Sequence, residues 1–483
     1  MVTTLHAKSG IENSKSGLLS GSVTGFLARI SGSFGTLVSG MVLARMLSPA
    51  DFGVYMLLFN VVVVASIMGT FGVGDAAVRF VGQSLGAGST AMAIRTAKQA
   101  LAIGALGMFA VVLLFPLTRD FLVRLDRNLS IGWYEGLVIV AWIFSYGVLT
   151  HIGYLLRAFG EITAGTIAES VLYRVGIVIA FGIAIAIGHR SLISVLIGSS
   201  LVAVVSTLIA FGWLARIFAR VPSSAVVAGA PAVAILVRWK ELLAVGLPLY
   251  GSAVLFRLMA DGTIFVVDHF RGAEAVALYG AAYRLWVAFS LPQVAVNAAL
   301  QPRLAMSAAT MNSERMQTLM HNAGKLAFWP TAAFAIVSLL GGNLVLSILY
   351  GPHYAEGRSV LAILSVAQLL CVFIGSSEHL MAMTGRHVAV LKVSVISAAS
   401  SLLLAWILTP SCGLVGAAIS AGLSSVLFKL FLALMARKEL GVSTFLPLKA
   451  LLEMPTFAKA RATTADSSMR MVAIHTSNET QDR

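Results

Sequence analysis

Long apolar segments recur along the whole chain, and each is long enough to cross a lipid bilayer as a helix. A helical span needs about 20 consecutive apolar residues, since each residue advances the helix by about 1.5 Å. The pattern predicts an all-α polytopic membrane protein with about twelve transmembrane helices and short connections. The predicted spans are about residues 21–44, 53–74, 95–118, 136–156, 166–188, 191–214, 240–263, 275–299, 323–348, 359–383, 387–409 and 412–436.

The composition excludes an ordinary soluble enzyme. Hydrophobic residues make up 58% of the chain and charged residues 11%, against roughly 25% charged residues in soluble domains. The net charge of +14 is carried mainly by the connections between apolar segments. We therefore interpret it as a determinant of topology, with no nucleic-acid partner. Cys371 and Cys412 lack the spacing of a disulfide framework or metal site, and the chain shows no nucleotide-binding motif or other cofactor motif.

Basic residues are divided unequally between the two sides of the membrane. With twelve spans and a cytoplasmic N-terminus, the cytoplasmic connections carry 16 Lys and Arg residues and the C-terminal tail five more, against seven on the opposite side. Loops rich in Lys and Arg stay in the cytoplasm. The count therefore predicts that both termini are cytoplasmic.

Four short matches at nearly one offset indicate an internal repeat. Tyr55 corresponds to Tyr279, and the three other pairs are Arg79 with Arg303, Gly160 with Gly385, and Arg216 with Arg437. Because each half would hold six spans, both halves enter the membrane in the same sense, which makes the repeat parallel. The predicted organisation is an N-terminal segment 1–20, a six-helix bundle 21–214, a cytoplasmic linker 215–239, a second six-helix bundle 240–437 and a cytoplasmic tail 438–483.

Charged residues inside the predicted spans are the candidates for function. A buried Arg or Lys costs roughly 2.5–3.5 kcal/mol at the centre of a span, so it usually faces a protein-lined or wet interior. The forked donors of arginine also suit phosphate. We therefore predict a cation-bearing cavity between the halves that binds an anionic group through Arg29, Arg257, Arg284, Arg174 and Lys392.

Several of these residues have a structural alternative. Arg257 is either a ligand contact or is neutralised by Asp261, four residues on. Arg174 is either a ligand contact or the partner of Glu169. Arg29 alternatively extends to the membrane surface, and Lys429 is expected to do so and is left out of the site.

Acidic and histidine side chains within spans are candidates for a coupling ion. They are Asp261, Glu378 and His379. The alternative is that each is a satisfied packing partner.

Three motifs resemble those of a known family. The stretch from Leu43 to Tyr55 after the first span, Phe71 to Arg79 closing the second, and Leu349 to Tyr354 before the tenth resemble Wzx-type polysaccharide transporters. These belong to the multidrug/oligosaccharidyl-lipid/polysaccharide exporter (MOP) superfamily. The resemblance implies a MATE-like fold of two parallel six-helix bundles around a central cavity.

The same resemblance implies alternating access and a function. The substrate would be an undecaprenyl-diphosphate-linked oligosaccharide, flipped across the bacterial inner membrane for exopolysaccharide, O-antigen or capsule synthesis. Membrane lipid, a polymerase and a chain-length regulator would be partners, and the chain would not be an enzyme.

Three other functions stay open. A lipid II flippase would also use basic cavity residues. A cation-coupled multidrug exporter would carry an acid in its first helix, and residues 21–44 have none. A membrane-embedded polysaccharide polymerase would need a long external loop with catalytic residues, and the predicted loops are short.

Overall fold

The computed structural model describes residues 31–32, 34–114, 132–220, 239–309 and 312–447. These residues are almost entirely helical and contain no β-strand. The predicted segment 1–20, most of the linker 215–239 and most of the tail 438–483 lie outside them. Among the described residues, eight helices are long and apolar enough to cross a membrane.

The N-terminal half is a series of helices joined by short turns. It begins with the apolar helix Phe34–Met46. Ser48 then caps the next helix by accepting a hydrogen bond from the Asp51 backbone amide, with Pro49 in the first turn, an arrangement that favours helix initiation. The helices that follow are α2 (Pro49–Thr70), α3 (Val73–Gly86), α4 (Thr90–Leu113), α6 (Trp133–Ala158), α7 (Ile162–Thr166), the π-helical η1 (Ile167–Leu172), α8 (Tyr173–Ala186) and α9 (Leu192–Arg220).

The C-terminal half contains longer helices. They are α10 (Trp239–Phe289), α11 (Leu291–Ala309), α12 (Ser313–Tyr350), the 3₁₀ turn η2 (Pro352–Gly357), α13 (Arg358–Ile374), α14 (Ser377–Met383) and α15 (His387–Leu440).

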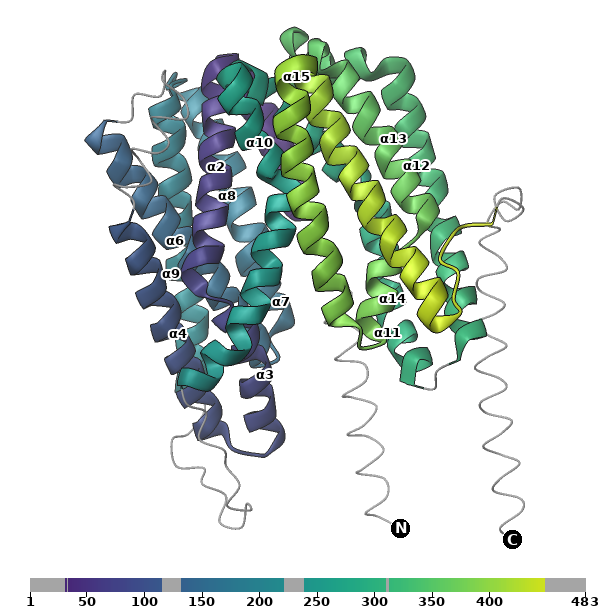
Figure 1. The fold of residues 1–483 in the computed structure, drawn as a ribbon. Helices are drawn as coiled ribbons and strands as arrows, with labels where there is room; N and C mark the ends of the chain where they lie inside the picture. The colour runs from purple at the N-terminus through teal and green to yellow at the C-terminus, as the bar shows by residue number, and fades with distance from the viewer. Residues whose placement is uncertain (1–30, 33, 115–131, 221–238, 310–311, 448–483) are drawn as a thin grey trace, which may run out of the picture.

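Two glycines divide the longest helices into pairs of limbs. Gly272 in α10 and Gly413 in α15 have positive φ angles of 77° and 60°, which glycine adopts without the steric cost of a Cβ. The two limbs of α15 run side by side from this turn (Figure 1). Each of these two helices therefore runs as two limbs, and the all-α fold class of a polytopic membrane protein is confirmed.

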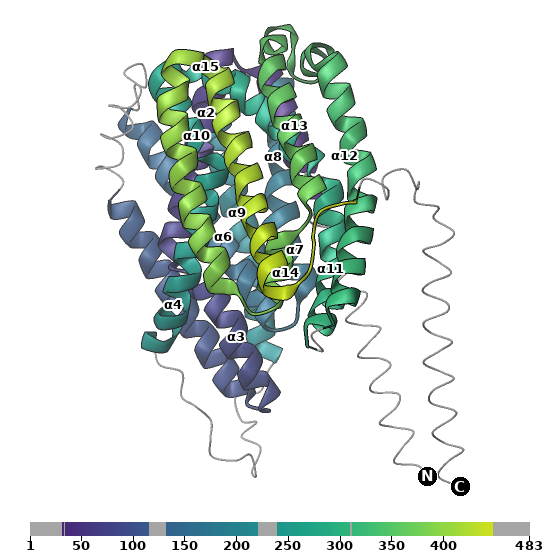
Figure 2. The same cartoon turned by 45° about the vertical axis from the view of Figure 1, so that its right-hand side comes forward.

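The helices form two lobes that meet closely at one end. In Figure 1, α2–α9 lie on one side and α11–α15 on the other, and the lobes separate toward the end that carries α3 and α14. Figure 2 shows the same lobes overlapping after a 45° turn. Helix α10 packs extensively on both α15 and α2, so it joins the two lobes.

Small residues let the lobes approach closely. A Cβ at Gly53 in α2 would collide with the backbone carbonyl of Ala273, and one at Gly280 would collide with Met56. At the same end, Phe52 meets Tyr354 edge-on with 5.8 Å between ring centroids. Close backbone approach through small residues is a common source of helix packing energy in lipid. We infer that this contact holds the lobes together at the end where α15 turns.

We predict that Gly53→Ala weakens this contact, because its Cβ would displace the Ala273 backbone. The cost is expected to be roughly 1–3 kcal/mol, as for overpacked cores. It would appear as a lower Tm of the purified protein in detergent. Gly82→Ala in α3 is the matched control, since nothing lies within 4 Å of its Cβ and alanine favours helix. An equal Tm for both variants would contradict the close contact.

Candidate functional site

Two of the sequence motifs meet across the lobes. The first motif supplies Phe52 at the start of α2, and the third supplies Tyr350 and Tyr354 around η2. Tyr354 contacts Phe52 and also Tyr350, at 5.8 Å between ring centroids in each case. All three rings are buried. The motifs therefore form one aromatic cluster, although about 300 residues separate them in sequence.

Arg284 lies directly against this aromatic cluster. Its Cζ is 5.8 Å from the centroid of the Phe52 ring, within the range of a cation–π interaction. A Cβ at Gly40 would lie 2.5 Å from its Nη1, so the small residue makes room for the guanidinium. Nη1 is buried and has no hydrogen-bond partner among the described residues. Since an unmade buried hydrogen bond costs about 1–3 kcal/mol, Arg284 has a donor ready for a ligand.

Arg174 lies in the N-terminal lobe and is also uncompensated. It lies in the first turn of α8, directly after the π-helical η1. A Cβ added at Gly35 would lie 3.1 Å from the Cβ of Arg174. Arg174 forms no hydrogen bond or ion pair with a described residue. Arg174 and Arg284 both lie against the helix Phe34–Met46, at Gly35 and at Gly40. The charge of Arg174 repels Arg284, while Asp261 attracts it. An anion between them would relieve this repulsion.

The alternative prediction that Arg174 pairs with Glu169 is wrong. Glu169 forms its ion pair with Arg157 of α6, which lies one helical pass away. Glu169 lies within the π-helical η1, and Arg174 follows five residues later in α8. Such turns are frequent at functional sites.

Arg257 is neutralised by Asp261, which was the alternative to a ligand contact. It pairs with Asp261 one turn along α10, and its Nη2 donates to Asn60 Oδ1 of α2 at 3.4 Å. Asn60 in turn donates to the Met56 carbonyl at 2.9 Å. Arg257 and Asp261 therefore form a polar link between α10 and the N-terminal lobe. The Arg257 side chain remains 32% exposed, which leaves a face open to a ligand.

The remaining predicted cations are placed differently. Lys392 is exposed in the first limb of α15, and no hydrogen bond or ion pair joins it to another described residue. Arg29 lies outside the described residues. The structure thus places Arg174 and Arg284 against the same helix, Phe34–Met46. Arg257 lies on the first limb of α10 and Arg284 on the second, and no described contact joins Lys392 to any of them.

Glu378 and His379 belong to a separate charge cluster in the C-terminal lobe. Lys429 Nζ of α15 lies 2.6 Å from Glu378 Oε1 in α14, and His379 Nδ1 lies 3.8 Å from the same oxygen. The expectation that Lys429 extends to the membrane surface is wrong, since its side chain is only 13% exposed. The sequence hides this partner because Glu378 is 51 residues away.

No group of three potential metal-ligating side chains occurs among the described residues. Asp261 is engaged with Arg257 and Glu378 with Lys429. Sequence reasoning overlooked Tyr350, whose buried hydroxyl has no hydrogen-bond partner in the part of the chain that the structure describes and whose ring contacts Tyr354 of the aromatic cluster. The third motif already contained this tyrosine.

The described fold is that of a multi-pass membrane protein, and it is similar to solved structures of MOP transporters. A multidrug-resistance MATE transporter in its inward-facing conformation has a TM-score of 0.70 and 18% identity, covering 87% of this chain and 98% of that chain. The lipid II flippase MurJ, in an inward closed conformation, has a TM-score of 0.66 and 13% identity, covering 90% and 89%. A MOP transporter from Pyrococcus furiosus has a TM-score of 0.63 and 17% identity, covering 87% and 95%.

The sequence itself identifies the family. A family model described as polysaccharide biosynthesis protein matches residues 21–308, which is more than half of the chain. The chain belongs to this family. A search of curated proteins gave no match.

We predict that Lys429→Met destabilises the protein more than the double change Lys429→Met with Glu378→Gln. Removing one partner of a largely buried ion pair leaves an unpaired charge and costs roughly 3–5 kcal/mol, whereas removing both charges is often nearly neutral. Thermal unfolding of both variants in the same detergent measures the difference. A single variant as stable as the double would show that Glu378 does not depend on Lys429.

Proposed function

We propose that this protein is a flippase that moves undecaprenyl-diphosphate-linked oligosaccharide repeat units across the bacterial inner membrane. The repeat units would feed exopolysaccharide, O-antigen or capsule synthesis. The observation that carries the proposal is the pair Arg174 and Arg284, with no acidic partner bound to either among the described residues. Arg174 lies in the N-terminal lobe, and Arg284 lies in α10, which joins the two lobes. Membership of the polysaccharide biosynthesis family supports the substrate class.

The arginine pair suits a diphosphate for electrostatic reasons. Two like charges held in a low-dielectric interior repel strongly, and an anion of higher charge converts that repulsion into attraction. Guanidinium groups bind phosphate oxygens in a forked geometry. The polyprenyl chain needs no polar contact and can stay in lipid while the sugar enters the polar interior.

The placement of the two arginines links binding to lobe motion. An anion that contacts both would join the N-terminal lobe to α10 at one point. A ligand shifts a conformational equilibrium by as much as its affinity differs between the states. Binding would therefore favour the arrangement that brings the arginines together, and release would follow when the lobes separate there.

The same charges favour this substrate over that of a multidrug exporter, since an uncompensated cationic interior repels cationic drugs. A lipid II flippase would bind the same diphosphate, so the attached sugar is the distinguishing feature. We place both termini in the cytoplasm, and a polymerase and a chain-length regulator as partners that act on the delivered repeat unit.

We predict that Arg284→Ala and Arg174→Ala each lower polysaccharide export by roughly tenfold to a hundredfold, the value of a lost charged hydrogen bond. Arg284→Lys should retain part of the activity, since it keeps the charge and loses the fork. Export is measured in cells that depend on this protein, with its membrane level checked. Arg358→Gln, an exposed arginine at the start of α13, is the control. Wild-type export in both alanine variants would remove the arginine pair from the site.

We also predict that proteoliposomes containing the purified protein flip an undecaprenyl-diphosphate oligosaccharide faster than lipid II. The diphosphate is common to both, so the difference reports recognition of the sugar. Protection of a fluorescent substrate from a membrane-impermeant quencher measures the rate. Faster flipping of lipid II would favour the lipid II flippase.

A further inference from the structure

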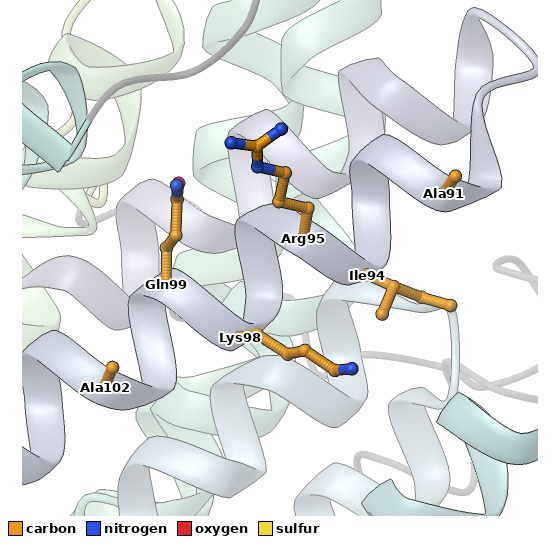
Figure 3. A pocket seen from close by; sticks show the side chains of 6 residues that line it. All are labelled: Ala91, Ile94, Arg95, Lys98, Gln99 and Ala102. Carbon is orange, nitrogen blue, oxygen red and sulfur yellow. The ribbon is translucent and has the colours of Figure 1, made fainter. Parts of the chain in front are cut away.

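A groove runs along the first half of α4, away from the arginine pair. Its volume is about 480 Å³, and it is lined by Ala91, Ile94, Arg95, Lys98, Gln99 and Ala102. In Figure 3, Arg95 and Gln99 project together from one side of the helix, and Lys98 projects on another side. The short side chains of Ala91 and Ala102 leave space over the helix at the two ends of the groove.

The position of Lys98 places the groove near the surface of the membrane. Its Nζ lies 5.8 Å from the ring centroid of Phe218, which is two residues before the end of α9 and packs on Phe159 at 5.9 Å. Helix α9 has 29 residues, about 43 Å at 1.5 Å per residue. The hydrocarbon core is about 30 Å thick, so this end of α9 reaches the headgroup region.

The groove carries positive charge that the protein does not neutralise. Arg95 and Lys98 are exposed, as are Arg216 and Arg220 near the end of α9. None of the four forms an ion pair with a described residue. Anionic lipids are drawn to such clusters with about 1 kcal/mol for each basic residue, and basic pockets between helices bind lipid headgroups.

Gln99 adds a specific polar contact. Its Oε1 is buried and has no hydrogen-bond partner among the described residues. An amide oxygen accepts hydrogen bonds and does not suit a phosphate. It does suit the hydroxyl group of a glycerol headgroup, which lies beside the phosphate of the same lipid.

We propose that this groove binds the headgroup of an anionic glycerophospholipid of the phosphatidylglycerol type. Arg95 contacts the phosphate, Lys98 adds positive charge beside it, Gln99 accepts a hydrogen bond from the headgroup glycerol, and Ile94 and the alanines contact the start of the acyl chains. The site is separate from the proposed substrate site and does not depend on it. If the basic residues served only to set the topology, their number on this side of the membrane would matter, and their position in the groove would not.

The test measures binding of phosphatidylglycerol and phosphatidylcholine to the purified full-length chain by native mass spectrometry. The double variant Arg95→Gln with Lys98→Gln should bind phosphatidylglycerol roughly tenfold to thirtyfold more weakly and phosphatidylcholine unchanged. The control is Arg437→Gln with Lys438→Gln, which removes the same charge from exposed positions near the end of α15. It should bind both lipids as the wild type does.

Three outcomes would overturn the proposal. Equal losses in the two double variants would show a diffuse charge effect. Equal binding of the two lipids by the wild type would exclude a charge-selective site. Displacement of phosphatidylglycerol from the groove by undecaprenyl diphosphate would assign the groove to the transported substrate.

A second variant keeps the charges and tests the glycerol contact. Gln99→Leu should reduce the preference for phosphatidylglycerol over phosphatidic acid, which lacks the headgroup glycerol, while both lipids still bind. An unchanged preference would remove Gln99 from the site.

Discussion

The bilayer makes every charge within a span costly, and the arrangement of this protein follows from how each charge is accommodated. Three ion pairs remove charge inside the lobes or at their junction: Arg157 with Glu169, Arg257 with Asp261, and Lys429 with Glu378. Each pair also joins two turns or two helices. Once these pairs are formed, the described interior retains Arg174 and Arg284 as cations without a bound acid, and these two define the candidate site.

Close packing of small residues decides where those cations lie. Gly53 and Gly280 let α2 and the second limb of α10 approach each other, and Gly40 leaves room for the Arg284 guanidinium. Phe52 then contacts both Arg284 and Tyr354. The lobes are therefore joined at one end by the same residues that surround the cation, so ligand binding and lobe contact share a small set of side chains.

Sequence reasoning found the apolar spans, because hydropathy is a local signal, and it proposed a repeat and a set of charged candidates. It failed for pairings between distant segments. Lys429 looked like a surface-seeking lysine, since its partner Glu378 is on another helix. Glu169 looked like the partner of Arg174, whereas it pairs with Arg157 of α6. The π-helical turn that contains Glu169 gives no clear sequence pattern.

The sequence by itself determined that this chain is a helical multi-pass membrane protein, because hydropathy and length are properties of each segment alone. It also determined that costly charges occur inside those segments. Only the tertiary structure decided which charges cancel and which remain, since that depends on the rotation of each helix about its axis and on contacts between the lobes. Arg257 and Arg284 are equivalent in a hydropathy profile, and the fold gives a carboxylate to one and not to the other.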